Sequence, residues 1–423
     1  MSNRTAKHLA SLQPGTLFAG VDLGLDDSVV VVLTATADRL DRFRSRNNAQ
    51  GYAALRQRLQ RLVEKHHAPG VLIGMEPTNY YWKQLGYDLE QHHMPFRLVN
   101  ALTVKRHREG DQLDRSKDDW RDAYTIADLL RQGKFTETRL PHGVYAELQT
   151  GYAAYQRLRR DRGRQATLLV NTIRQLFPEF EQVFKDVSRV TAGAVIAAGL
   201  LPHVISASSE DLFLASVRSQ FTGHRLCVRS VRRLYVLAKD SYGCREATTA
   251  LHLMAQHQVE TIRCLDLQAQ RLLDTLLALF HTLPEAPYVL SIQGLGAPAA
   301  LGLVAQTGDL TQYPHGSALI KLAGTQPTPN TSGRKTYSPT PFSHQGRSCL
   351  RTVAYFATMR LIQQNDALHY HYQRLTTRPE HPLPKMQAIG ACMNKLLWYA
   401  WHVAKRREMY DDQHWCTLNR SAA

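Results

Sequence analysis

The first third of the chain alternates short apolar runs with amphipathic stretches. Four apolar runs have the length of buried β-strands: 17–22, 28–34, 70–76 and 96–100. A further strand is a candidate at 42–46, and the apolar spacing of helices occupies 51–66, 82–89 and 118–131. Strands and helices that alternate in this way predict a sheet with helices packed on it.

The middle of the chain has an almost wholly helical pattern. Apolar residues step by four and three over 148–176 and again over 262–279, with Arg159 and Arg162 in two of the apolar slots. This heptad spacing predicts either an antiparallel helical hairpin or an intermolecular coiled coil, with an ordinary packed bundle as the alternative. Residues 186–243 are too irregular for elements to be assigned.

The pattern changes again after Pro287. An apolar segment at 291–300 leads through a turn with Gly294 and Gly296 into a helix start. The turn amides could hold a DNA phosphate, or the turn could simply join two helices. Residues 324–346 are rich in Thr, Ser, Pro and Gly and predict a loop. Two helices are expected after it, at 349–362 and 386–407.

These changes of pattern divide the chain into three expected parts: an α/β domain at 1–144, a helical or coiled-coil region at 145–285, and a mostly helical C-terminal domain at 286–423. A chain of 423 residues is long enough to bury the cores of two or three domains.

Charge narrows the choice of partners. Lys and Arg number 52 against 36 Asp and Glu, a net charge of +16, which favours a polyanionic partner. Nucleic acid is the first candidate and a membrane surface the competing one. No apolar run is long enough to span a membrane and no secretory signal is visible, so a cytoplasmic protein is expected. The six cysteines include no C-x-x-C pair, which argues against a zinc site or a disulfide framework.

Four acidic residues lie at the boundaries of predicted elements. Asp22 ends one strand in G-V-D-L-G, and Glu76 ends another in I-G-M-E-P-T. Asp119 and Asp122 are three residues apart on a predicted helix, so they share a face. Acids near one point repel each other unless cations lie between them, and Mg²⁺ or Mn²⁺ prefers carboxylate oxygens. Two such ions can clamp a phosphodiester and stabilise both its attacking and its leaving oxygen.

Each acid alone has an ordinary explanation. Asp22 could be a turn residue, and the helical pair could be a solvated face, since Asp118 and Asp128 show that acids are common here. The combination is more specific. A strand acid, a second strand acid and a helical D-x-x-D, in this order in a basic chain, is the layout of an RNase H-like nuclease of the Holliday-junction-resolvase (RuvC-like) type.

Motifs at both ends of the chain resemble those of one family. The N-terminal motifs are G-V-D-L-G, G-M-E-P-T-N-Y-Y-W and K-D-D-W-R-D-A-Y-T-I-A. The C-terminal motifs are I-Q-G-L-G-A-P-A-A-L-G-L-V-A-Q-T-G-D-L, L-A-G-T-Q-P-T-P-N-T-S-G and G-R-S-C-L-R. The family is that of the insertion-sequence transposases with an N-terminal DEDD domain, the bridge-RNA-guided recombinases. Lys117 sets the register, so Asp119 and Asp122 match the family acids and Asp118 does not.

The sequence departs from the family pattern in three places. Arg334 stands where a second glycine usually follows the Ser-Gly, and Ser343-His344-Gln345-Gly346 replaces a basic stretch. The helical middle is also longer than in compact members.

The resemblance implies a reaction that residue patterns alone do not give. It selects Ser332 as a nucleophile, whereas composition would leave it one hydroxyl among Thr331, Ser338 and Ser343. The four acids would hold Mg²⁺ or Mn²⁺, and Ser332 would attack the scissile phosphate to form a covalent phosphoserine. A covalent bond preserves the phosphoester energy, so strands can be rejoined without ATP. The resemblance also implies a structured guide RNA that pairs with donor and target DNA.

Basic residues are expected to line the nucleic-acid path, although each group could instead be a solvated helix face. The candidates are Lys105, Arg106, Arg108, Arg157, Arg159, Arg160, Arg334, Lys335, Arg347 and Arg351. Tyr80, Tyr81 and Trp82 could stack on bases, with core packing favoured for Trp82. Recombination acts on two duplexes, so a homodimer or homotetramer is expected. Two alternatives remain: a structure-specific endonuclease that uses water, and a non-catalytic nucleic-acid-binding protein.

Overall fold

The computed structural model describes residues 3–77, 81–111, 118–136, 139–328, 330–332, 335–337, 341–413 and 415. The chain divides into two compact units, Met1–Leu140 and Pro141–Ala423. They are called unit 1 and unit 2 below, and each is described by itself. None of the described helices is long and apolar enough to cross a membrane.

Unit 1 is built on a mixed five-stranded sheet. Its strands are β1 (Leu17–Leu23), β2 (Asp27–Leu33), β3 (Arg39–Arg46), β4 (Val71–Met75) and β5 (Phe96–Leu98), in the order β3-β2-β1-β4-β5. β1, β2 and β3 pair in antiparallel fashion, and β4 and β5 continue the sheet parallel to β1. Three antiparallel strands extended by two parallel ones form the RNase H-like arrangement, so the predicted fold class is confirmed.

The helices of unit 1 cover both faces of this sheet because its strands are apolar on both faces. They are α1 (Asn3–Ala10), α2 (Ala49–Lys65), α3 (Tyr81–Gln91), α4 (Ala101–Asp111) and α5 (Asp119–Arg131). Leu17, Ala19 and Val21 of β1 share a core with α2 and α3. Phe18 faces the other way and packs with α5, as the period-2 alternation of a strand requires.

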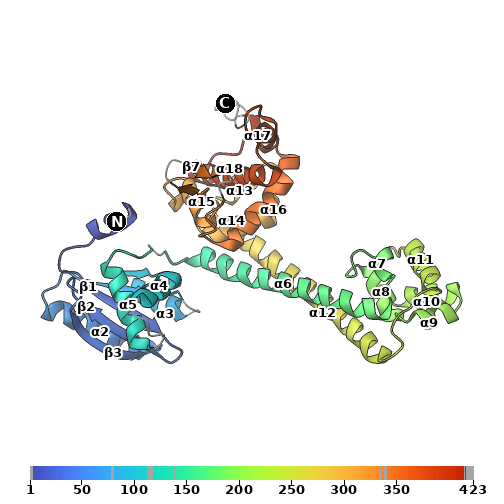
Figure 1. Ribbon diagram of the computed structural model, residues 1–423, viewed down its shortest axis with the longest axis horizontal. Coiled ribbons are helices and arrows are strands. Elements are labelled where there is room, and N and C mark those ends of the chain that lie inside the picture. The colour runs from blue at the N-terminus through green and yellow to red at the C-terminus, as the bar shows by residue number, and fades with distance from the viewer. Residues whose placement is uncertain are drawn as a thin grey trace. The chain divides into compact units, whose positions relative to one another are not determined.

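Unit 2 is organised around two long helices, α6 (Gly143–Leu176) and α12 (Thr248–His281), which run side by side (Figure 1). Leu148 near the start of α6 shares a core with Phe280 near the end of α12. Ile173 near the end of α6 shares another with Val259. The helices are therefore antiparallel within one chain, which is one of the arrangements that the heptad spacing predicted.

The irregular segment 186–243 belongs to a cluster of short helices that begins at Phe180 and lies at one end of this pair (Figure 1). They are α7 (Phe180–Val183), α8 (Val190–Ala198), α9 (Pro202–Ala207), α10 (Glu210–Ser219) and α11 (Val228–Ala238). Their apolar side chains form a core with the ends of α6 and α12.

The C-terminal helices pack around the other end of the pair and share a core with it. They are α13 (Ala286–Leu290), α14 (Ala297–Thr307), the 3₁₀ turn η1 (Leu310–Gln312), α15 (Ser317–Ala323), α16 (Ser348–Gln364), α17 (Asp366–Thr377) and α18 (Lys385–Arg406). The expectation of a loop throughout 324–346 was wrong. Strands β6 (Asn330–Ser332) and β7 (Lys335–Tyr337) form an antiparallel hairpin there.

Candidate active site

Asp22 near the end of β1 and Glu76 directly after β4 occupy matching positions on two neighbouring chain segments. β1 and β4 pair in parallel with Val21 opposite Met75, so Asp22 and Glu76 are the next positions along this register. Adjacent strands lie about 4.8 Å apart, and matched positions point to the same face of a sheet. Both acids are only partly buried, which leaves their side chains within reach of solvent and substrate.

The acid-bearing face of the sheet is the one that α5 covers. A Cβ on Gly20 would lie 2.0 Å from the carbonyl oxygen of Ala123 and 2.5 Å from the amide nitrogen of Ala127, so only glycine permits this approach of helix to strand. Asp22 is two residues beyond Gly20 and therefore faces α5 as well.

The direction of α5 brings its first turn to the acidic end of β1. Phe18, early in β1, packs with Leu129 and Leu130 late in α5, whereas Gly20 lies beneath Ala123. α5 is therefore antiparallel to β1. Its N-terminal turn, which carries Asp119 and Asp122, reaches the end of the strand where Asp22 and Glu76 stand.

The three acids around the start of α5 have different environments. Asp118 is the N-cap, and its side chain accepts a hydrogen bond from the Trp120 amide at 3.2 Å. Capping of this kind satisfies a backbone donor and needs no catalytic explanation. Asp119 is exposed, and Asp122 is buried with 7% of its surface accessible. The structure thus gives a structural role to the one acid that the family register leaves out.

These four carboxylates fit a divalent cation by donor type. Among the described residues, no three His, Cys, Asp or Glu side chains are already arranged to hold a metal ion.

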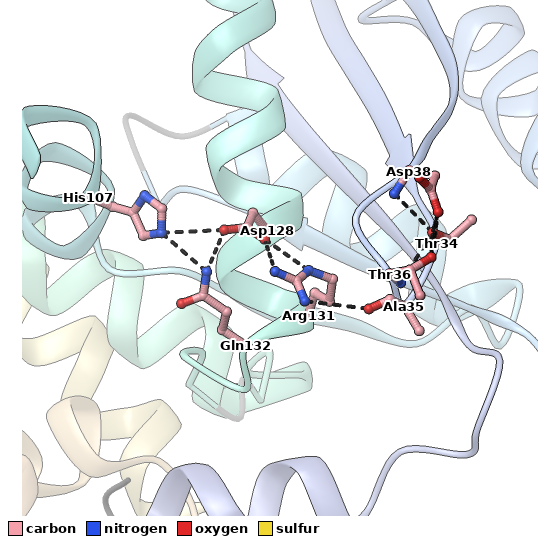
Figure 2. Close-up of polar contacts among 8 residues, drawn as sticks. All are labelled: Thr34, Ala35, Thr36, Asp38, His107, Asp128, Arg131 and Gln132. Carbon is pink, nitrogen blue, oxygen red and sulfur yellow. Dashed lines mark hydrogen bonds and ion pairs between the residues drawn. The ribbon is translucent and has the colours of Figure 1, made fainter. Parts of the chain in front are cut away.

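Asp128, considered above as one of the commonplace acids of this helix, is instead a buried hydrogen-bond acceptor with 7% accessibility. Figure 2 shows Arg131 donating to its Oδ1 through Nε at 2.9 Å and through a terminal nitrogen at 2.6 Å. Gln132 also donates to Asp128, and His107 Nε2 of α4 lies 3.4 Å from its Oδ2. The network ties α4 to α5, and its clue in the sequence is the Asp128–Arg131 spacing of an i,i+3 pair.

A second feature that sequence reasoning missed lies beside the acids. The guanidinium carbons of Arg42 and Arg44, on β3, lie 5.4 and 5.6 Å from the ring centre of Trp120. The alternation of arginines in R-F-R-S-R at 42–46 was the available signal, because alternate residues of a strand share one face.

The predicted basic residues on α4 and α6 differ in whether their side chains have ion-pair partners. Lys105 and Arg106 are exposed on α4, and the side chain of Arg108 lies outside the described part of the chain. Arg157 and Arg160 are exposed on α6. Arg159 is 54% exposed and pairs with Asp266 of α12 at 3.7 Å.

Arg162, which was expected in an apolar slot, shares Asp266 with Arg159 and donates to Ser188 Oγ at 2.5 Å. Two arginines at heptad positions of α6 thus make polar contacts between segments of unit 2. Their spacing marks an interhelical pairing and is not by itself a sign of nucleic-acid binding.

Ser332 is the last residue of β6, and its backbone pairs with Lys335 of β7. Arg334 lies outside the described residues, as does Tyr80 of the predicted stacking group. Arg347 donates to the Gln306 carbonyl, and Arg351 donates to the Ala323 carbonyl at 2.8 Å. These two arginines hold the segments on either side of the hairpin, which is a structural role that the sequence did not indicate.

Family models of known proteins match an N-terminal and a C-terminal part of the chain. Residues 19–178 match the family model of the IS110-type DEDD transposases, and residues 286–373 match the model described as transposase of the IS116/IS110/IS902 family. The candidate transposase of the IS117 mini-circle from Streptomyces coelicolor is 23% identical over 413 residues, which cover 94% of this chain and 96% of that protein.

Among solved structures, unit 1 is similar to RuvC of Thermus thermophilus, alone and in complex with a Holliday junction substrate. The identities are 11% and 14% and the TM-scores 0.21 and 0.22, and each match covers 29% of this chain and 99% of RuvC. The fold assignment rests on the strand order described above.

The strand order places unit 1 in the RNase H-like class of nuclease domains. With the two family matches in the same chain, the protein is a transposase of the IS116/IS110/IS902 family, an enzyme that cleaves and rejoins DNA.

Proposed function

We propose that this transposase exchanges DNA strands in a Mg²⁺-dependent reaction that passes through a covalent phosphoserine. The observation that carries the proposal is the placement of the acids in unit 1. Asp22 and Glu76 are neighbours at one sheet edge, and the first turn of α5 brings Asp119 and Asp122 toward that edge.

In this proposal the four carboxylates hold Mg²⁺ or Mn²⁺. Such an ion, when bound, neutralises charge on the phosphodiester and lowers the pKa of a coordinated hydroxyl. The residues supply anionic oxygen ligands, and the helix dipole at the start of α5 stabilises acids in its first turn. Burial of Asp122 and the close packing of α5 on Gly20 fix where that turn lies relative to β1.

Ser332 acts as the nucleophile. Its Oγ forms a bond to phosphorus while the bond from phosphorus to the leaving nucleoside oxygen breaks, and the serine proton ends on the released hydroxyl. Attack by a hydroxyl of another strand reverses this step and regenerates the serine, so the number of phosphodiester bonds is conserved. The motif match around Ala323, Gly324, Pro327, Ser332 and Gly333 supports this assignment.

The family resemblance also supports the partners: donor and target DNA duplexes, a structured guide RNA, and a second copy or three further copies of the chain. A net charge of +16 suits several polyanions bound at once. A-form RNA would be read mainly through its shape and backbone.

The test is a covalent trap. Full-length protein is incubated with the element's RNA, Mg²⁺ and end-labelled DNA that carries the element junction, and denaturing gels then report label attached to protein. We expect the adduct with the unaltered chain and with Ser343→Ala, and none with Ser332→Ala. Adduct formed by Ser332→Ala would refute the serine role.

The two alternatives give different patterns in the same experiment. Mg²⁺-dependent cleavage without any adduct would identify an endonuclease that uses water. Binding without strand breakage would identify a non-catalytic nucleic-acid-binding protein.

A further inference from the structure

The edge strand β3 carries a row of arginines on one face. Phe43 packs in the core with α2, and Asp41 is ion-paired to Arg58 of α2, so these positions face α2. Arg42, Arg44 and Arg46 alternate with them and therefore point to the opposite face, where α5 lies. All three arginines are exposed.

The register of the sheet relates this row to the acids. Asp22 of β1 pairs with Val29 of β2, and Val29 pairs with Arg44 of β3. Arg44 therefore lies on the same face as Asp22, two strands away. Two strand spacings place their Cα atoms about 10 Å apart. By the same register Arg42 is level with Gly20, and Arg46 pairs with Asp27 beyond the level of Leu23, so the row extends to both sides of the level of Asp22.

Trp120 joins the row to the acidic turn. It follows Asp119 directly, and its ring lies under the guanidinium groups of Arg42 and Arg44 at 5.4 and 5.6 Å. Stacking on a ring orients a guanidinium while leaving its N–H donors for another ligand. Within the described part of the chain, none of Arg42, Arg44 and Arg46 has a carboxylate partner.

We propose that Arg42 and Arg44, which Trp120 orients, bind backbone phosphates together with Arg46 on the DNA strand that is held at the acids. This inference rests on the proposed function for the identity of the strand. Contacts between this row of arginines and the phosphates position the DNA strand and do not recognise its base sequence.

A row of charges on an edge strand can also have a purely protective role, because it prevents the strand from pairing with another chain. That role requires charge alone. It requires neither the stacking on Trp120 nor the register that brings Arg44 to the face of Asp22.

The test is a salt titration of DNA binding by the full-length chain in EDTA. The probe is a fluorescein-labelled single-stranded DNA oligonucleotide of mixed sequence, followed by fluorescence anisotropy. The variant is Arg42→Gln with Arg44→Gln. The matched control is Arg61→Gln with Lys65→Gln, which removes the same charge from exposed positions of α2 on the other face of the sheet.

Loss of two phosphate contacts on a single strand lowers the salt slope of log K by about 1.4, which corresponds to a loss of affinity on the order of 25-fold at about 0.1 M salt. We expect this for the β3 variant and a much smaller change for the α2 control. Equal losses of affinity for both variants would show a general charge effect and would overturn the proposed phosphate contacts. Aggregation of the β3 variant with unchanged affinity would overturn them as well.

A lysine variant and an RNA probe test the phosphate contact and the DNA assignment separately. Arg42→Lys with Arg44→Lys keeps the charges and should keep most of the salt slope, whereas a loss equal to that of the glutamine variant would refute phosphate contact. An RNA oligonucleotide of the same length serves as second probe, and a loss confined to RNA would refute the DNA assignment. Because binding in EDTA needs neither metal nor Ser332, the outcome is independent of the covalent trap.

Discussion

Replacing Gly20 with alanine tests how closely α5 sits on β1. The added Cβ would lie 2.0 Å from the carbonyl oxygen of Ala123 and 2.5 Å from the amide nitrogen of Ala127. Both are backbone atoms, so no side chain can rotate away. Ordinary contacts begin at 3.4 Å, and 3.4 − 2.0 gives a separation of 1.4 Å that must come from movement of α5 or bending of β1.

The consequences for stability and activity differ in size. Overpacking of this kind lowers the free energy of unfolding by about 1–3 kcal/mol. The same movement displaces the turn that carries Asp119 and Asp122, and a misplacement of about 1 Å in a catalytic site reduces activity by on the order of 100-fold. We therefore expect Gly20→Ala to lose most of its strand cleavage while the protein remains folded.

The assay pairs urea unfolding with Mg²⁺-dependent cleavage of the labelled junction DNA. Gly70→Ala is the control, because a Cβ there meets nothing within 4 Å in the same unit. Circular dichroism under the cleavage conditions establishes that the protein is folded. If Gly20→Ala matched Gly70→Ala in both stability and cleavage, the placement of α5 and its acids over β1 would be wrong.

Two other substitutions probe a buried group, Asp128, and a half-buried one, His371, both outside the proposed catalytic residues. Asp128→Ala removes the acceptor of the network between α4 and α5 and should lower the free energy of unfolding by about 1–3 kcal/mol in urea titrations. The control, Glu64→Ala at an exposed position, should change it little, and equal effects would contradict the network's role. Burial, together with the nearby Lys395 and Arg374, lowers the pKa of His371 to about 4 from 6.5. Its contribution to stability is present above pH 6.5 and is lost as the pH falls through about 4. His371→Gln should therefore flatten the pH dependence of unfolding over that range, and an unchanged slope would show that another group titrates there.

The sheet of unit 1 was accessible from sequence because its strands are short apolar runs of the right length. Glu76 and Asp22 could be picked as strand-end acids, but their adjacency depends on the parallel pairing of β1 with β4, which links segments far apart in the sequence. The alternation of arginines in β3 is visible in the sequence. That these arginines share a face with Asp22 becomes clear only from the strand register and from the face on which α5 packs.

Other features depend on contacts that no local pattern specifies. Asp118 and Asp128 read alike as helical acids, yet one is an N-cap and the other a buried acceptor. Ser332 lies in a segment whose composition indicates a loop, and the hairpin there is held by few backbone pairs. Its assignment as nucleophile comes from the family motif, which no backbone pairing in this segment encodes.

The measurement that tests the central claim most directly is the chemical location of the covalent bond to DNA. The adduct formed in Mg²⁺ is digested with protease and nuclease, and mass spectrometry identifies the residue that retains the nucleotide. The proposed mechanism predicts a nucleotide on Ser332 that disappears in Asp22→Asn. A nucleotide on any other residue, or strand exchange by the unaltered chain with no adduct at all, would contradict it.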